Sequence, residues 1–242
     1  MTFADISAIR LAQRRREEAL GFVSHDLRSP VHAIMLVADL HLQGKLQWTQ
    51  PELLTEVQRQ ANRALQLADE FVRVARAESH PLQLVEVAPA ELLAEVLADC
   101  QPQALDAAVQ LALAIAPGLP MWRLDRALVR RALGNLASNA IKHSPRGGSV
   151  TLAVRLADDD GTVSLAVTDE GPGLTPAQCR QLEQEAQGLP AGDARGVGLG
   201  LLFVQRVAAR HGGRLLARPG PGQRGTVVEL RLAALVAGGA AG

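Results

Sequence analysis

Apolar residues recur at helical intervals through the first third of the chain. The first set is spaced by three or four positions and lies along one helical stripe: Leu20, Val23, Leu27, Val31, Ile34 and Ala38. A second set follows the break "QGKLQWTQP" and alternates steps of three and four, as in a heptad seam: Leu54, Val57, Ala61, Ala64, Ala68, Phe71 and Ala75. The pattern predicts two long helices joined by a short loop into an antiparallel hairpin. One hairpin cannot cover both seams, so we expect two copies to pair into a dimeric four-helix bundle.

The hydrophobic period changes at about residues 80–89, where we place the domain boundary. Beyond it, "PAELLAEVLADCQPQAL" and "DRALVRRALGNLASNAIKH" have the helical period, and a further helix is expected over about 200–211. The alternation typical of strands appears in "VQLALAIA", "SVTLAVRLA", "TVSLAVTD", "GRLLARP" and "GTVVELRLA". Together these segments predict an α+β fold, in which the helical hairpin precedes an α/β sandwich. Its helices would cover one face of a mixed, mostly antiparallel sheet.

These boundaries predict the domain organisation. Residues 1–80 form the helical hairpin, 81–88 a linker and 89–235 the second domain. Residues 236–242, "VAGGAAG" from Val236 onward, form a tail that is flexible by composition.

Charge and cysteine content exclude several classes of partner. The 242 residues carry 25 basic and 25 acidic side chains, so no global field favours nucleic acid or an anionic membrane surface. Cys100 and Cys179 lie far apart, outside metal-ligand or redox spacing, which fits a reduced cytoplasmic protein. No stretch approaches the roughly 20 apolar residues that span a bilayer. We expect contact with a membrane only through a sensor region upstream of these residues.

The stretch "FVSHDLRSP" places a histidine outside the apolar stripe of the first helix. On a helical wheel His25 falls roughly 140° from Leu20, so it points away from the stripe. Asp26 adjoins it and Ser29 follows one turn later on the same side. A neutral imidazole is a nucleophile near neutral pH, and a neighbouring carboxylate can hold one ring nitrogen while the other stays free. The residues alone leave two interpretations, a nucleophile or an ordinary surface histidine.

Polar groups also line one side of the otherwise apolar helix "NLASNAIKH". Asn135, Asn139 and Lys142 are spaced by four and three positions. Buried amides without partners are costly, and a bound metal with phosphates would satisfy them. Without such a ligand, the two asparagines would cap or satisfy a loop.

Two glycine-rich segments follow. "DEGPG" comes directly after a strand and combines the acid Asp169 with Gly171 and Gly173, which permit a close approach of the backbone to a ligand. "GVGLGL" places glycines before a helix, where free N–H groups favour phosphate: Gly196, Gly198 and Gly200. Neither segment has the dinucleotide fingerprint or a Walker lysine.

Together and in this order, these segments resemble the sensor histidine kinases of two-component signalling over about residues 10–235. "SHDLRSP" resembles the H box of that family, "NLASNAIKH" its N box, and "DEGPG" and "GVGLGL" its first and second glycine boxes. The resemblance implies a dimerisation and histidine-phosphotransfer hairpin, followed by an ATP-binding domain of the fold shared with gyrase and a heat-shock chaperone.

The resemblance also implies an enzyme, a protein-histidine kinase that uses ATP and Mg²⁺. His25 would accept the γ-phosphoryl group, and Asp26 would orient or deprotonate it. The phosphoryl group would then pass to an aspartate in the receiver domain of a response regulator, which would dock around His25. The protein would act as a cytoplasmic homodimer with no nucleic-acid partner.

In the ATP-binding domain the resemblance assigns Asn139 to Mg²⁺ and Asp169 to the amino group of adenine. The remaining nucleotide contacts are assigned to the phosphates, the ribose and the lid: Asn135, Lys142, His143, Gly171, Gly173, Gly196, Gly198, Gly200 and Leu201.

The chain departs from the family pattern at three places. Between the glycine boxes the family usually has an F box with a phenylalanine, whereas this interval contains no aromatic residue, and Leu182 is the candidate for that place. Val197 stands where a hydroxyl residue is common. Ser29 occupies the position where threonine or asparagine often orients water for dephosphorylating the regulator, so it is the candidate phosphatase residue.

Two alternatives to an active kinase stay open on the sequence. The first is a pseudokinase or phosphotransfer adaptor, whose ATP domain binds nucleotide or a partner without efficient catalysis; the F-box departure favours it. The second is an ATPase of the same superfamily without histidine transfer, against which the H box argues.

Overall fold

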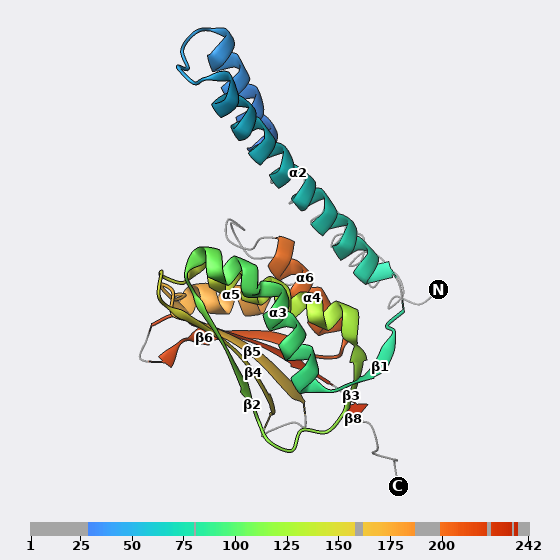
Figure 1. Cartoon of the computed structure of the whole chain (residues 1–242). Helices are drawn as coiled ribbons and strands as arrows, with labels where there is room; N and C mark the ends of the chain where they lie inside the picture. The colour runs from blue at the N-terminus through green and yellow to red at the C-terminus, as the bar shows by residue number, and fades with distance from the viewer. Residues whose placement is uncertain are drawn as a thin grey trace, which may run out of the picture. The chain divides into compact units, whose positions relative to one another are not determined.

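The computed structural model describes residues 29–79, 81–157, 162–186, 199–221, 224–233 and 235–236. The chain divides into two compact units, Met1–Arg76 and Ala77–Gly242 (Figure 1). No helix in these described ranges combines the length and the apolar character needed to cross a membrane.

The first unit contains a helical hairpin. Residues 29–42 are helical, and after a short turn α2 runs over Gln50–Ser79. Gly44 in the turn has a φ of +66°, a left-handed conformation that glycine adopts without a steric penalty. Glu52 caps the start of α2, because the backbone N–H and the hydroxyl of Thr49 both donate to its carboxylate, at 2.7 and 2.8 Å. Local chemistry therefore fixes where the first helix ends and α2 begins.

A single hairpin leaves large apolar side chains exposed. Among the hairpin residues whose burial the structure describes, five large apolar residues expose more than half of their surface: Met35, Leu36, Leu42, Leu54 and Leu65. Apolar surface exposed on both helices of the hairpin in this way marks an interaction face. It is the kind of surface that pairing of two hairpins would cover.

The second unit is built on a five-stranded sheet in the order β2-β4-β5-β7-β6. The strands are β2 Gln110–Ile115, β4 Ser149–Leu156, β5 Val163–Asp169, β6 Arg214–Pro219 and β7 Thr226–Leu232. β2 pairs with β4 in parallel, and the other three pairs are antiparallel. The expected mixed, mostly antiparallel sheet is confirmed.

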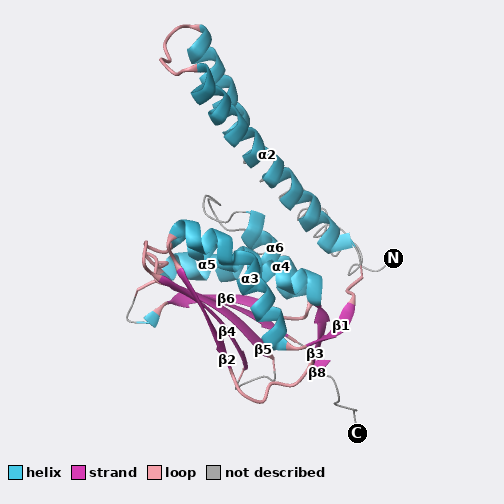
Figure 2. Cartoon of the chain, in the orientation of Figure 1, coloured by secondary structure: helices cyan, strands magenta, loops and turns pink. Residues whose placement is uncertain are grey.

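Four helices lie on one face of this sheet (Figure 2). They are α3 Pro89–Ala107, α4 Arg126–His143, α5 Pro176–Ala186 and α6 Leu199–Arg210. Alternate strand residues face them: Val150, Leu152 and Val154 of β4 are fully buried, as are Leu92, Leu93 and Val96 of α3. Burial of this apolar surface is the main term that holds the layers together. The α+β architecture expected from the sequence, a helical region followed by an α/β sandwich, is confirmed.

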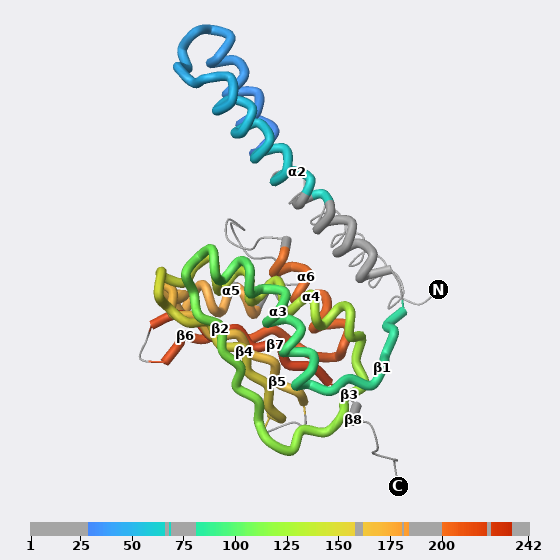
Figure 3. Tube along the Cα trace, in the orientation of Figure 1, coloured from blue at the N-terminus to red at the C-terminus, as the bar shows by residue number. Residues whose placement is uncertain are grey.

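The sequence pattern did not predict α5 or a second, small sheet of three short strands. These are β1 Leu84–Val87, β3 Trp122–Asp125 and β8 Leu235–Val236, in the order β1-β3-β8. Figure 3 shows β1 and β3 side by side. With two to four residues each, they are too short to show a period of two. Trp122 of β3 is completely buried, so the small sheet contributes a large side chain to the packed interior.

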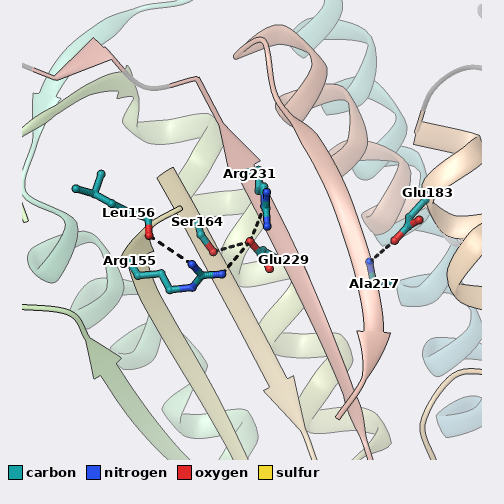
Figure 4. A network of polar contacts seen from close by, with 7 residues as sticks. All are labelled: Arg155, Leu156, Ser164, Glu183, Ala217, Glu229 and Arg231. Atoms are coloured by element: carbon teal, nitrogen blue, oxygen red, sulfur yellow. Dashed lines mark hydrogen bonds and ion pairs between the residues drawn. The ribbon is translucent and has the colours of Figure 1, made fainter. Parts of the chain in front are cut away.

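The opposite face of the large sheet carries a network of charged side chains centred on Glu229 (Figure 4). The Glu229 carboxylate accepts from Ser164 Oγ and Arg231 Nε, both at 2.8 Å, and Arg155 pairs with it at 3.6 Å. Burial alone would raise the pKa of the Glu229 carboxyl, but hydrogen bonds from Arg231 and Ser164 hold the pKa below its ordinary value. The network therefore ties β4, β5 and β7 together on the face away from the helices.

Candidate functional site

α4 carries the N-box residues, and a side-chain cap fixes its N-terminal end. Asp125 precedes the helix, and its Oδ1 accepts from the backbone N–H of Leu128 at 3.1 Å. The apolar face of α4 is buried, whereas Asn135 is half-buried and Asn139 is exposed. Lys142 and His143 are exposed at the C-terminal end, where cations complement the helix dipole. α4 therefore presents amide and basic groups along one edge of a packed helix.

The first of these amides contacts the start of α6. Asn135 Nδ2 donates to the carbonyl oxygen of Gly200 at 3.1 Å, between residues 65 positions apart. A Cβ atom at Gly200 would lie 3.5 Å from the same Nδ2, an ordinary van der Waals distance, so the two helices are in contact at this point. Gly200 and Leu201 thus lie in the first turn of α6, beside the N-box helix.

Asp169 ends β5 and is buried. Its Oδ1 accepts two backbone hydrogen bonds, from Gly171 N–H at 2.8 Å and Thr226 N–H at 3.1 Å. Its other oxygen, Oδ2, accepts no hydrogen bond from the described residues. The carboxylate is therefore fixed in orientation through one oxygen and keeps an acceptor for a ligand.

Close backbone packing surrounds this carboxylate. A Cβ atom at Gly171 would lie 2.7 Å from the His143 carbonyl oxygen and 2.9 Å from Asp169 Oδ1, so only glycine fits there. Gly225, in the turn between β6 and β7, donates its N–H to Gly171 O at 2.9 Å. Gly173 has a φ of +81° and packs against the Gly225 carbonyl. The first glycine box and the β6–β7 turn thus form one compact backbone structure.

Sequence reasoning missed Gly225 and Thr226. Thr226 is buried, and its N–H reaches Asp169 across 57 residues. The dipeptide "GT" at the start of β7 was a weak signal, since a glycine just before a strand also fits an ordinary turn.

A hydrogen bond connects α5 to α6 where the family's F box would lie. Leu182 of α5 is buried, and its carbonyl oxygen accepts from Gln205 Nε2 at 3.2 Å. Phe203 of α6 is also buried, with the guanidinium of Arg131 5.7 Å from its ring centroid. An aromatic residue therefore lies near the site, contributed by α6 and not by the interval between the glycine boxes.

Several expected site residues fall outside the described ranges. His25 and Asp26 of the H box are among them, as are Gly196 and Gly198 of the second glycine box. Ser29 is described and is exposed on the helix of residues 29–42.

The described residues bring the N box and both glycine boxes together. α4 touches the first box through the His143 backbone and the second through Asn135. The side chains of Asn139, Lys142 and His143 form no hydrogen bond or ion pair with other described residues. Within the described ranges no three histidine, cysteine or acidic side chains gather as a metal site. The arrangement offers a fixed acceptor at Asp169 for a polar base, and exposed amide and basic groups for phosphates with a metal ion.

Comparisons with known proteins give two family matches. Residues 15–80 match the His Kinase A (phospho-acceptor) domain, and residues 124–235 match the histidine kinase-, DNA gyrase B- and HSP90-like ATPase. The histidine protein kinase DivJ of Caulobacter vibrioides is 31% identical over 229 residues, which cover 92% of this chain and 38% of DivJ. The chain therefore spans well under half the length of that relative.

Solved structures agree with these matches. The full-length ShkA structure in complex with AMPPNP is 28% identical, with a TM-score of 0.65 over 91% of this chain and 46% of ShkA. The histidine kinase ThkA in complex with the response regulator protein TrrA is 17% identical, with a TM-score of 0.71 over 96% of this chain and 67% of that one. At that identity the second likeness shows the fold alone.

Proposed function

Because the chain belongs to the sensor histidine kinases of two-component signalling, we propose that it transfers the γ-phosphoryl group of ATP to His25. The phosphoryl group then passes to an aspartate of a response regulator. One observation carries the proposal: a phospho-acceptor domain that contains His25 precedes an ATPase domain that contains Asn139 and Asp169 in one chain.

We assign the domains the roles expected from the sequence. Residues 1–80 form the dimerisation and histidine-phosphotransfer hairpin, and 81–88 link it to the catalytic ATP-binding domain of 89–235. Residues 236–242 form a tail. Two hairpins pair through the exposed apolar face that includes Met35, Leu42 and Leu65, which gives a homodimer.

Asp169 reads the base. Its Oδ2 accepts from the amino group of adenine, while Oδ1 stays bonded to Gly171 and Thr226. A nucleobase with a carbonyl at that position would set two acceptors against each other, so the site selects adenine. The fixed carboxylate needs no rearrangement before it binds, which favours affinity.

The polar edge of α4 holds the triphosphate. Asn135, Lys142 and His143 contact phosphates or ribose, and Asn139 supplies an amide oxygen to Mg²⁺. The backbones of both glycine boxes and the first turn of α6 shape the lid around the phosphates: Gly171, Gly173, Gly196, Gly198, Gly200 and Leu201. Mg²⁺ supplies charge neutralisation and orientation of the phosphate oxygens.

His25 is the nucleophile. As its free ring nitrogen bonds to the γ-phosphorus, the bond from that phosphorus to the bridging oxygen breaks and ADP leaves. Asp26 holds the other ring nitrogen and accepts the proton that the imidazole gives up. Positioning and charge supply most of the rate, since this transfer needs little covalent help from the protein.

The phosphorylated hairpin faces a response-regulator receiver domain around His25. The solved complex of ThkA with TrrA supports a partner of this class. Ser29 follows His25 by four residues and is exposed, and we assign it to orient the water that hydrolyses the phosphorylated regulator. We assign the described part of the chain to the cytoplasm, where ATP and receiver domains are found.

A second function is favoured by the interval between the glycine boxes, which contains no aromatic residue. If Leu182 cannot order the lid, the chain is a phosphotransfer adaptor that binds nucleotide without transferring phosphate. Nucleotide binding without labelling from ATP distinguishes this adaptor from the kinase.

The test is labelling of the full chain with γ-labelled ATP and Mg²⁺. The kinase gives a label that is lost in acid and kept in alkali, as expected for a phosphoramidate, and His25→Gln removes it. His32→Gln, at an exposed histidine of the helix of residues 29–42, is the matched control and keeps the label. Label that persists in His25→Gln would overturn the assignment.

A further inference from the structure

A buried histidine outside the nucleotide contacts joins the two helices of the site at their far end. His211 follows α6 and is buried, with only 6% of its surface exposed. Its Nε2 accepts from the backbone N–H of Asp125 at 3.1 Å, and its Nδ1 contacts the Val207 carbonyl oxygen at 2.8 Å. Since a carbonyl oxygen can only accept, Nδ1 carries the proton and the ring is neutral. His211 therefore bonds the end of α6 to the residue that caps α4.

Asp125 also bonds to the segment that enters the second unit. Its Oδ1 caps α4 through Leu128 N–H, and its Oδ2 accepts from the backbone N–H of Gln83 at 3.0 Å. Gln83 directly precedes β1, whose first residue Leu84 pairs with Asp125 in the small sheet. One side chain thus joins the expected linker to the start of the N-box helix.

The same two helices are joined at two further levels. Arg131 of α4 lies over the ring of Phe203 of α6, and Asn135 donates to Gly200 at the start of α6. The residue numbers rise along α4 and fall along α6 from one contact to the next, so the helices are antiparallel. Asp125 and Asn135 are about 15 Å apart along α4 at the usual helical rise. The contact at the phosphate end and the contact at the linker end belong to one packed pair of helices.

We propose that Asp125 and His211 are positioning residues that couple the order of the entering segment, residues 81–87, to nucleotide binding. The inference rests on the proposed function, since it takes the site of Asn139 and Asp169 to bind ATP or ADP. Helices packed at native density shift as units, so a change where Asn135 meets Gly200 reaches the other end of the pair. Coupling is reciprocal, and a change in residues 81–87 alters nucleotide affinity by the same factor.

Two substitutions of His211 separate this role from simple packing. In His211→Asn the amide nitrogen replaces Nδ1 and keeps the bond to Val207, but the side chain is too short to reach Asp125. In His211→Gln the amide oxygen has the reach of Nε2 and accepts from the Asp125 N–H. If the coupling depends on an acceptor for the Asp125 N–H, His211→Gln keeps the coupling and His211→Asn loses it.

A third substitution cuts the link to the entering segment alone. Asparagine caps helices as well as aspartate does, so Asp125→Asn keeps the bond from Leu128. Its amide nitrogen then faces the Gln83 N–H, donor against donor. The matched control is Ser164→Ala, which removes a buried hydrogen bond to Glu229 on the other face of the sheet.

The experiment is amide hydrogen exchange of the full chain with and without MgADP, with calorimetry to measure ADP binding. In the unsubstituted chain, His211→Gln and Ser164→Ala, we expect MgADP to slow exchange in residues 81–87 by about fivefold or more. In His211→Asn and Asp125→Asn we expect ADP to bind while the slowing falls below about twofold.

Failure of the coupling and failure of the proposed function give different results. If the unsubstituted chain binds ADP without slowing exchange in residues 81–87, the coupling is wrong. The same holds if His211→Asn keeps the slowing, or if Ser164→Ala loses it, since the effect would then follow overall stability. If calorimetry detects no ADP binding by the unsubstituted chain, the proposed function itself is overturned.

Discussion

The two sides of the proposed nucleotide site differ in how far they are built before any ligand binds. On the base side, Asp169 and Thr226 are buried, and the carboxylate already accepts two backbone hydrogen bonds. On the phosphate side, Asn139, Lys142 and His143 are exposed, and their side chains have no hydrogen bond or ion pair with other described residues.

The difference assigns recognition and catalysis to different parts of the fold. A rigid, buried acceptor contributes to affinity and base selection, because its orientation costs nothing at binding. Exposed groups on the phosphate side contribute little to folding and act only when phosphates and Mg²⁺ are present. Substitutions on the phosphate side should therefore change labelling more than stability, and substitutions around Asp169 should change affinity and stability together.

The largest expected effect is that of Asn139→Ala. Loss of the amide that we assign to Mg²⁺ should slow labelling by about 100-fold or more, the scale on which one electrostatic stabiliser acts. Because Asn139 is exposed, the free energy of unfolding should change by less than about 0.5 kcal/mol. Labelling rates and urea denaturation measure the two quantities. Ser138→Ala, its neighbour on α4, is the control; an equal loss of labelling there would refute the specific role of Asn139.

Asp169→Asn should weaken ADP binding by about 10- to 100-fold. The physical reason is the loss of a hydrogen bond to a charged acceptor, worth about 1.5–3 kcal/mol. Calorimetry measures the affinity. The adjacent Glu170 is exposed and bonds to Ser149, so Glu170→Gln should bind ADP within about twofold of the unsubstituted chain. Equal weakening by both variants would show that Asp169 does not read the base.

Gly171→Ala tests the close packing on the base side. Its Cβ atom would lie 2.7 Å from the His143 carbonyl oxygen, so we expect a loss of about 1–3 kcal/mol in the free energy of unfolding. Gly134 lies within α4 with nothing within 4 Å of an added Cβ, so Gly134→Ala should stabilise by about 0.5–1 kcal/mol. Chemical denaturation should show a lower free energy of unfolding for Gly171→Ala and a higher one for Gly134→Ala. A change of the same sign in both variants would contradict this packing.

The smallest expected effect is a pH dependence that comes from His211. Burial lowers the pKa of its imidazole from the ordinary 6.5, and Arg210 acts in the same direction, against the Val207 hydrogen bond and Asp125. The unfolded chain therefore takes the proton first, so the free energy of unfolding should decrease as pH falls through 6.5 toward the lower folded-state pKa.

Denaturation at several pH values checks this prediction. His211→Gln should flatten the change in that window, whereas His143→Gln, at an exposed histidine of the same unit, should leave it in place. Glu229, the other buried group with a lowered pKa, acts only below its ordinary value of 4.5 and does not overlap. If the free energy of unfolding of His211→Gln changed with pH as steeply as that of the unsubstituted chain, the pH dependence would come from other groups.

The sequence predicted those parts of the fold whose signals are local. Heptad steps from Leu54 onward predicted α2, and strand alternation predicted β4 and β5. The acid and glycines of "DEGPG" predicted a turn with a carboxylate available to a ligand, because that chemistry is contained in five consecutive residues.

Contacts between distant residues could not be predicted in this way. The bond from Thr226 to Asp169 depends on the pairing of β5 with β7, and the bond from Asn135 to Gly200 depends on how α4 packs on α6. His211 gave no periodic signal, because its role comes from a single contact with Asp125. Such contacts arise from tertiary packing. The local pattern around one residue does not show which distant residue it will meet.

Location of the phosphoryl group tests the central claim most directly. After incubation of the full chain with ATP and Mg²⁺, digestion with trypsin under alkaline conditions releases the peptide Glu17–Arg28, which contains His25 as its only histidine. Mass spectrometry should find the phosphoryl group on His25 in that peptide and on no other residue. A phosphoryl group on His32 or on another side chain, or an unmodified chain that nevertheless binds ATP, would contradict phosphorylation of His25.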